Sequence, residues 1–351
     1  MSKYLKEKTN YNKYPVTETG LKNAGVSGWN AITNLLEETI AALQSKKLTI
    51  AVECYHGLYD AEILSALQKK FDAKYIISTD YFLSEKEIDA LVHPDVTDDE
   101  VFGYISRLDI TDFFDKEKLQ AAKKILKKHA GISFVFGCGA SIICPAPDLL
   151  LYADMARWEI QLRFRKNEIS NLGSSNKTLK TSLQYKRAFY VDWRVCDRVK
   201  KKILPTANFI LDTNKPHHRN MVTGAAYMTA LQTTVQQPFR VVPFFDPGSW
   251  GGQWMKEYCD LEGSVANYAW CFDCVPEENS LLLQFDDIIF ETPAINLVYC
   301  KASQLLGNAV QARFGDEFPI RFDFLDTMDG GNLSLQVHPT TEYAQEKFGI
   351  N

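Results

Sequence analysis

The sequence predicts an α/β plus β protein: a mainly parallel sheet with helices on both faces, followed by a region built from short strands. Three observations lead to this prediction. The 351 residues are too many for a single hydrophobic core. Strand-like and helix-like patterns alternate over residues 29–214, as in a parallel sheet joined by crossover helices. From about Pro238 the apolar residues come in short bursts between turn residues, which is typical of β structure.

Apolar spacing predicts the elements of the first region in order. Residues 29–44 carry an apolar stripe at helical spacing, because Ile32, Leu36 and Ile40 recur every four residues. Short apolar runs predict strands at 48–52, 75–77, 132–136 and 209–211. Helical spacing of apolar residues predicts further helices at 61–71, 116–128, 155–166 and 183–200.

In the second region, the apolar residues are spaced differently along the sequence. Turn sequences such as Asp246-Pro247-Gly248 separate its apolar bursts. These bursts predict strands at 241–245, 268–272, 281–285, 288–290 and 333–337, with one helix at 294–306. We therefore expect a polar leader over 1–28, an α/β domain over 29–214, a linker with a helix near 221–233 over 215–237, and a β domain over 238–351.

Composition excludes several classes of partner. A net charge of -5 gives no electrostatic reason to expect nucleic acid or an anionic membrane. The first residues are polar and lack the apolar run of a secretion signal, and the most apolar later stretch is too short to span a bilayer. With eight cysteines and no export signal, we expect reduced thiols in the cytoplasm. Cys271 and Cys274 form a single Cys-x-x-Cys, for which a structural role is favoured over metal or redox chemistry.

The run from Leu48 to Leu67 has the layout of a phosphate-binding strand, loop and helix. Such a loop needs several glycines, a lysine and a serine or threonine. Here Gly57 is the loop's one glycine, so it is a weak candidate for phosphate binding. Tyr59 and Asp60 stand where Lys and Ser/Thr belong, and Glu53 stands where the first glycine belongs. The loop is therefore a degenerate P-loop, and we do not expect ATP as a cofactor.

A segment further on resembles the uridine kinase and phosphoribulokinase-like group. The segment Ser78-Thr79-Asp80-Tyr81-Phe82 follows a predicted strand, and a basic helix carries Arg157, Arg163 and Arg165. The resemblance implies that Asp80 lies where that family keeps its catalytic base, and that the basic helix corresponds to its lid. In the alternative interpretation, Asp80 caps the following helix and the arginines form a solvated face.

Near the C-terminus, alternation predicts a strand over 332–338. Leu333, Leu335 and Val337 would point to one face, and Gln336 and His338 to the other. An amide oxygen and an imidazole two residues apart on one face can share a metal ion, although such a face is more often merely exposed to solvent. Gln336 and His338 are therefore candidate metal ligands.

The segments FLD, LSLQVHP and EYA within residues 318–344, with Trp250-Gly251-Gly252 upstream, resemble class I mannose-6-phosphate isomerase. The resemblance covers residues from Pro238 onward. It implies a partial cupin-type jelly roll, a zinc ion bound by Gln336 and His338, and the interconversion of mannose 6-phosphate and fructose 6-phosphate. The sequence departs from the family pattern where Asp323 stands in place of a usual Lys, and because a Glu and a second His would have to follow Asn351.

These departures lead us to expect a sugar-phosphate isomerase family member that is incomplete and inactive as this chain, with a small phosphorylated sugar as its ligand. The alternative is a non-catalytic protein whose kinase-like domain binds a nucleotide or sugar phosphate. A third possibility is a homo-oligomer, or added strands, that completes an open sheet edge.

Overall fold

The computed structural model describes residues 4–7 and 9–348. The chain divides into two compact units. The first, here the α/β unit, comprises residues 23–155, 159–228 and 339–351. The second, here the β-rich unit, comprises residues 1–22, 156–158 and 229–338. Among the described residues, no helix has the length and apolar character needed to cross a membrane.

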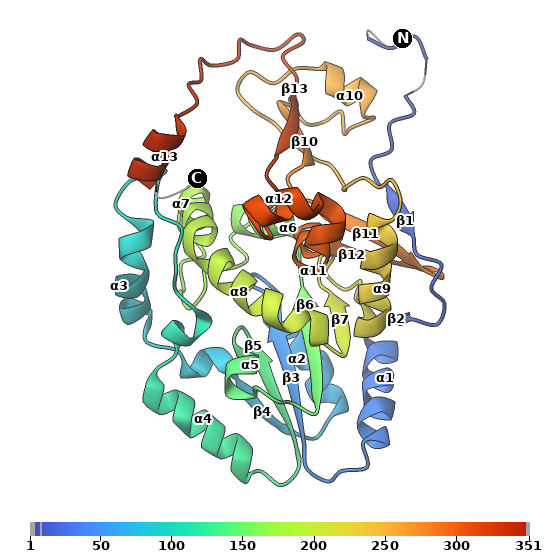
Figure 1. Cartoon of the computed structure of the whole chain (residues 1–351), viewed down its shortest axis with the longest axis vertical. Helices are drawn as coiled ribbons and strands as arrows, with labels where there is room; N and C mark the ends of the chain where they lie inside the picture. The colour runs from blue at the N-terminus through green and yellow to red at the C-terminus, as the bar shows by residue number, and fades with distance from the viewer. Residues whose placement is uncertain (1–3, 8, 349–351) are drawn as a thin grey trace. The chain divides into compact units, whose positions relative to one another are not determined.

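A seven-stranded mixed sheet forms the centre of the α/β unit. Its order is β2-β8-β7-β6-β3-β5-β4 (Figure 1). Strands β4, β5, β3, β6 and β7 run parallel, β8 is antiparallel to β7, and the edge strand β2 is antiparallel to β8. The strands are β2 (Gly25–Ser27), β3 (Leu48–Cys54), β4 (Lys74–Ile77), β5 (Ile132–Gly137), β6 (Leu149–Asp154), β7 (Phe209–Asp212) and β8 (Asn220–Thr223). A mainly parallel sheet was predicted, and its interior strands are buried along most of their length, as parallel strands between helical layers are.

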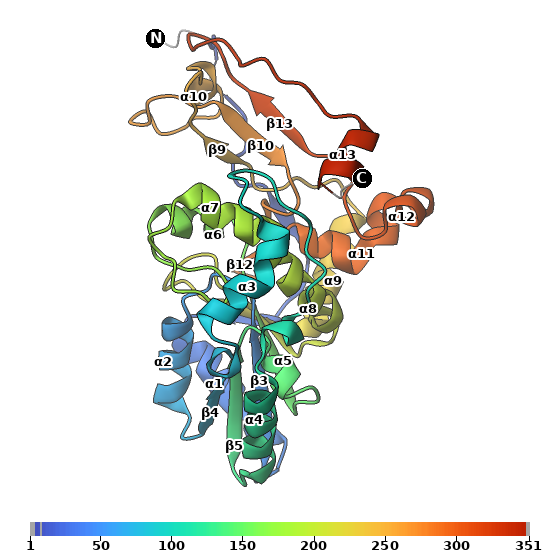
Figure 2. The same cartoon turned by 90° about the vertical axis from the view of Figure 1, so that its left-hand side faces the viewer.

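Helices cover both faces of this sheet. The chain moves from β3 to β4 in one direction and from β4 back to β5 in the other, so right-handed crossovers place α2 and α4 on opposite faces. Figure 2 shows α1 and α2 on one side, and α4 and α5 on the other. The helices that lie wholly or mostly in this unit are α1 (Trp29–Ala42), α2 (Asp60–Lys70), α3 (Glu85–Val96), α4 (Lys116–Lys128), α5 (Ala140–Ile143), α6 (Arg157–Arg165), α7 (Thr181–Arg187), α8 (Trp193–Ile203) and α13 (Thr341–Phe348), with short helical turns η1 (Ser78–Tyr81), η2 (Ile110–Phe113), η3 (Ala188–Asp192) and η4 (Leu204–Thr206). Helix α9 (Gly224–Val235) begins in this unit, and its residues from Thr229 onward belong to the β-rich unit.

The structure differs from the predicted elements at several places in this unit. Helices α3 and α5 and strand β6 were not predicted, although β6 is a buried apolar run like the predicted β3. Strands β2 and β8 lie in the expected leader and linker, since three or four residues are too few to show a period. The helix expected at 183–200 is interrupted by the π-helical turn η3.

The β-rich unit contains two three-stranded sheets. In the first, β1 (Val16–Glu18) pairs in parallel with β11 (Ser280–Phe285), which forms an antiparallel hairpin with β12 (Ile288–Pro293). In the second, β10 (Trp270–Cys274) lies between β9 (Phe244–Asp246) and β13 (Phe322–Leu325), antiparallel to both. The unit's helices are α10 (Trp254–Tyr258), α11 (Ile295–Leu306) and α12 (Asn308–Phe314).

The strand predicted at 332–338 is wrong. Between β13 and α13 the described chain has no regular secondary structure beyond a turn. Leu335 and Val337, which were to anchor the strand in a core, are 95% and 87% exposed. Alternation alone does not make a strand, because a strand needs a neighbour for its backbone hydrogen bonds and a surface to cover its apolar face.

Candidate functional site

The loop between β3 and α2 is filled by its own side chains. Tyr55 and His56 are 1% and 3% exposed. The Tyr55 hydroxyl donates a hydrogen bond to Asp197 Oδ1 at 2.9 Å, and His56 Nε2 lies 2.9 Å from the Ser170 carbonyl oxygen. Burial lowers the pKa of His56. A P-loop presents bare backbone N–H groups to phosphate, whereas large aromatic rings pack here.

A buried lysine reaches this loop from a distant part of the sequence. Lys200 Nζ on α8 lies 3.0 Å from Asp154 Oδ1 at the end of β6 and 4.0 Å from the centre of the Tyr55 ring. The lysine and the aspartate side chains are 1% and 3% exposed. A P-loop keeps its lysine within the loop, so sequence reasoning did not find Lys200. The signal for its burial is the helical face that Lys200 shares with the buried Cys196 and Val199. Its charge is already paired with a carboxylate.

The basic helix predicted as a lid packs into the interior. Arg163 on α6 is 0% exposed, and Arg157 is 2% exposed, so the alternative of a solvated arginine face is wrong for both. The Arg163 guanidinium donates to the carbonyl oxygens of Gly57 (3.0 Å), Thr213 (2.9 Å) and Asn214 (3.2 Å). It also lies 3.8 Å from the centre of the Tyr59 ring. The arginine thus ties the degenerate loop to the segment after β7.

Gly57 and Glu53 both serve this packing. Gly57 has φ of +91°, and a Cβ there would lie 3.1 Å from a methyl group of Ile160, so the position suits glycine. Glu53 accepts hydrogen bonds from the backbone N–H groups of Gly139 (2.6 Å) and Ser141 (2.7 Å). Burial raises the pKa of Glu53 to about 7. The Glu53 carboxyl group therefore occupies two backbone N–H groups, which are no longer available to an external anion.

Asp80 does not join this cluster. It lies on η1 after β4 with an exposed side chain, and β5 separates β4 from β3. The capping alternative is wrong as well, because α3 is capped by Ser84 in a capping box with Glu87. Asp80 and Gly57 therefore follow strands that are not direct neighbours in the sheet.

A cavity of 520 Å³ lies elsewhere in the α/β unit. This volume falls within the range of about 300–1,000 Å³ that is typical of small-molecule sites. Its wall combines aromatic rings, hydroxyl and amide groups, and charges of both signs. The aromatic residues are Phe102, Tyr185, Phe189 and Tyr190; the uncharged polar ones are Gln161, Thr181 and Ser182; the charged ones are Glu100, Arg165 and Lys186. We call this the 520 Å³ pocket.

Three segments that are far apart in sequence build this pocket. Helix α6 supplies Gln161 and Arg165, the loop after α3 supplies residues 100–102, and α7 with η3 supplies the rest. The Lys186 ammonium holds the loop in place, because it donates to the carbonyl oxygens of Thr97 and Asp99. Gln161 is 9% exposed, and its Nε2 has no hydrogen-bond partner among the described residues.

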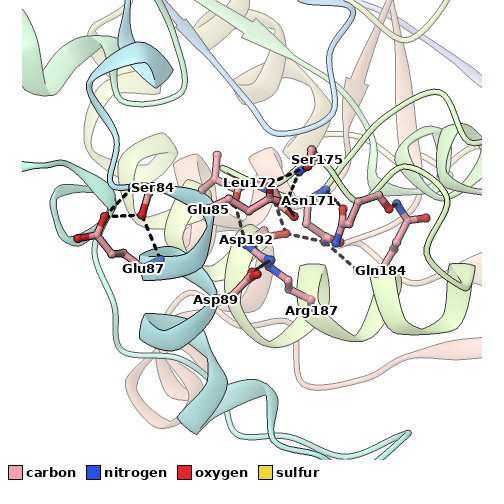
Figure 3. A network of polar contacts seen from close by, with 12 residues as sticks. Ser84, Glu85, Glu87, Asp89, Asn171, Leu172, Ser175, Gln184, Arg187 and Asp192 are labelled. Carbon is pink, nitrogen blue, oxygen red and sulfur yellow. Dashed lines mark hydrogen bonds and ion pairs between the residues drawn. The ribbon is translucent and has the colours of Figure 1, made fainter.

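A buried polar network lies on the opposite face of α7 and η3 (Figure 3). Arg187 donates to Asp89 Oδ1 (3.0 Å) and to the Leu172 carbonyl oxygen (2.8 Å). Asp192 Oδ2 accepts from Asn171 Nδ2 at 2.7 Å. The network joins α3, the loop before α7, and the π-helical turn. Sequence reasoning missed it, because charged residues on a helix normally indicate an exposed face.

Gln336 and His338 do not form a metal site in this structure. Both are exposed and lie on a segment without regular structure. Over the described residues, no group of three or more His, Cys, Asp or Glu side chains is placed to hold a metal ion. Two exposed donors do not fit zinc, which takes at least three protein ligands. Cys271 and Cys274 both lie on β10, and burial raises the pKa of Cys271 to about 11, which suits a structural thiol.

Comparison with known proteins identifies a family for the α/β unit. A family model described as "Domain of unknown function (DUF8485)" matches residues 28–236. No curated protein matches the chain. One similar solved structure is shikimate kinase from Bacteroides thetaiotaomicron, which is 10% identical over 48% of this chain and 88% of that one, with a TM-score of 0.30. At that score the similarity carries no argument about function.

Proposed function

The chain belongs to the family described as a domain of unknown function (DUF8485), and we propose that its α/β unit binds a small phosphorylated metabolite without transferring the phosphoryl group. The observation that carries the proposal is the 520 Å³ pocket, which combines an aromatic wall with two cationic side chains. A nucleotide and a sugar phosphate share the chemistry that such a wall recognises: a ring and an anion.

The pocket's chemistry favours an anionic ring compound. Arg165 and Lys186 bring two positive charges to the wall and Glu100 brings one negative charge. The Lys186 ammonium also donates to the carbonyl oxygens of Thr97 and Asp99. Arginine and lysine are the usual partners of phosphate oxygens. The rings of Tyr185 and Phe189 in this wall lie nearly parallel, with centroids 6.1 Å apart, and aromatic rings of this kind can pack against a base or a sugar ring.

The loop after β3 argues against phosphoryl transfer. A transferring site needs exposed backbone N–H groups and a lysine that is free to reach the β- and γ-phosphates. Tyr55 and His56 fill that loop, and Lys200 is paired with Asp154. We therefore interpret the α/β unit as a scaffold that binds a phosphorylated ligand and does not transfer its phosphoryl group.

Binding is tested with AMP, mannose 6-phosphate and inorganic phosphate as probes, by calorimetry and by thermal melting of the full chain. We expect AMP or mannose 6-phosphate to raise the melting temperature, since a ligand at about 100 times its Kd adds about 2.7 kcal/mol of stability. Arg165→Met is expected to weaken binding about tenfold or more, which corresponds to about 1.4 kcal/mol for each factor of ten.

Lys202→Met is the matched control, because Lys202 is an exposed cation on α8 that does not line the pocket. It should leave the affinity unchanged. The proposal fails if none of the three probes binds, or if the two variants bind equally well. Release of ADP from ATP in the presence of mannose 6-phosphate would contradict the absence of phosphoryl transfer.

Isomerase activity in residues 238–351 stays a prediction from resemblance, as do its zinc ion and its partial jelly roll. A sugar phosphate would then be a ligand common to both parts of the chain. Purified chain supplied with zinc should show no conversion of mannose 6-phosphate to fructose 6-phosphate, because two exposed donors do not fit a zinc ion. Turnover by the chain alone would contradict the expectation that it is inactive.

A further inference from the structure

The helical segment 181–203, which forms one wall of the 520 Å³ pocket, contains a π-helical turn. Helix α7, turn η3 and helix α8 follow one another without a break from Thr181 to Ile203, and the junction residues Ala188 and Trp193 keep helical backbone angles. Turns with i→i+5 hydrogen bonding are rare, and they occur mostly at functional sites. A regular α-helix would have been the default for this sequence.

The helical segment around this turn has two faces with different surroundings. Tyr185, Lys186, Phe189 and Tyr190 line the pocket. Gln184, Arg187, Ala188, Val191 and Asp192 are buried on the other side. Any change in the turn therefore moves the pocket wall and the buried network together.

An ion pair spans the turn at i,i+5. Arg187 Nε lies 3.6 Å from Asp192 Oδ1. In an α-helix these two positions would be about 140° apart around the axis, so only the wider turn brings them face to face. The pair is thus a direct product of the π-helical geometry.

This pair is incompletely made. At 3.6 Å the contact is too long for a hydrogen bond. Both Arg187 Nε and Asp192 Oδ1 are buried and have no other hydrogen-bond partner among the described residues. The remaining groups of the two side chains are satisfied: Arg187 binds Asp89 and Leu172, and Asp192 binds Asn171. Two orphaned groups of opposite charge therefore face one another across a small gap.

The pocket loop is attached to the same turn. Ser106 N donates to the Tyr190 carbonyl oxygen at 2.9 Å, and Lys186 next to Arg187 holds the carbonyl oxygens of Thr97 and Asp99. A Cβ on Gly103 would lie 3.0 Å from the Tyr190 ring, so the loop packs tightly on η3. A shift of the turn is carried to the loop through these contacts.

We propose that Arg187 and Asp192 are positioning residues for the pocket, and that ligand binding closes the gap between Arg187 Nε and Asp192 Oδ1. This inference rests on the proposed function. Closing the gap completes a charge-assisted hydrogen bond in a buried site, and the same movement sets Phe189 and Tyr190 against the ligand. The ligand-bound state thereby gains a contact that the empty state lacks, as a coupled element requires.

The test compares Asp192→Asn with Asp89→Asn. Each replaces one carboxylate partner of Arg187 by an amide of the same shape. In Asp192→Asn, an amide that keeps the Asn171 contact through its oxygen presents its NH₂ group to Arg187 Nε, so that the gap cannot close. Asp89 is 57% exposed and binds Nη1 instead, so Asp89→Asn leaves the gap as it is.

We expect Asp192→Asn to weaken binding of the stronger probe, AMP or mannose 6-phosphate, by about tenfold, within the usual size of a coupling between two sites. Asp89→Asn should change Kd less than twofold. In the wild type, the same probe should slow amide hydrogen exchange over residues 184–193, and this slowing should be lost in Asp192→Asn. Affinities are measured at a temperature where melting curves show both variants to be folded.

A purely structural role would lower the melting temperature of Asp192→Asn and leave Kd and the ligand-dependent exchange as in the wild type; that result overturns the inference while the proposed function stands. If the wild type binds none of the three probes, the proposed function fails and the inference fails with it. Binding of inorganic phosphate alone overturns the inference and leaves the proposed function standing.

Discussion

Lys200→Met is expected to lower the free energy of unfolding by about 3–5 kcal/mol, the range for a buried ion pair that loses one partner. The substitution removes the ammonium that lies 3.0 Å from the Asp154 carboxylate, and both side chains are almost fully buried. It also removes the cation from the face of the Tyr55 ring. Urea denaturation at pH 7 measures the change.

Adding Asp154→Asn to Lys200→Met should restore part of the loss, because the buried negative charge that lost the lysine is then gone. Lys202→Met is the control, since Lys202 lies two residues further along α8 and is exposed, and it should change stability by less than about 0.5 kcal/mol. Equal effects of Lys200→Met and Lys202→Met would mean that the buried pair does not stabilise the loop.

Arg163→Leu is expected to destabilise the chain by a similar amount, about 3–5 kcal/mol. The arginine serves three carbonyl oxygens, those of Gly57, Thr213 and Asn214, and a leucine would leave them without that donor. Each unsatisfied buried group costs about 1–3 kcal/mol. Limited proteolysis should show earlier cleavage in residues 55–59, because the arginine is what ties this loop to the segment after β7.

Arg163→Lys should recover only part of the stability, since an ammonium lacks the planar fork that reaches several acceptors at once. Arg165→Met serves as the control on the same helix, because Arg165 is exposed, and its effect on stability should be small. A leucine variant as stable as the wild type would show that the loop holds itself closed without the arginine.

Most elements of the α/β unit could be predicted from periodicity. The helix predicted at 116–128 is α4 to the residue, and the strand predicted at 48–52 is the first part of β3. Amphipathic helices and bounded apolar runs carry their period in the sequence itself. Strand β6 was missed although it is a buried apolar run like β3, because an apolar run without alternation does not by itself distinguish a strand from a loop or a buried helix. The strand predicted at 332–338 failed because no neighbouring strand pairs with it.

The sequence by itself determined that this chain has an α/β part in which the loop after the first predicted strand lacks the lysine and the glycines of a P-loop, since residues 53–60 can be read directly. Only the tertiary structure decided what fills that loop: Lys200 from α8 and Arg163 from α6 meet it from more than 100 residues away. The 520 Å³ pocket likewise joins segments near residues 100, 161 and 185, and the Arg187–Asp192 pair depends on a π-helical turn. Local periodicity records which face of an element is buried, whereas the partner across that face is chosen by packing, which no short stretch of sequence encodes.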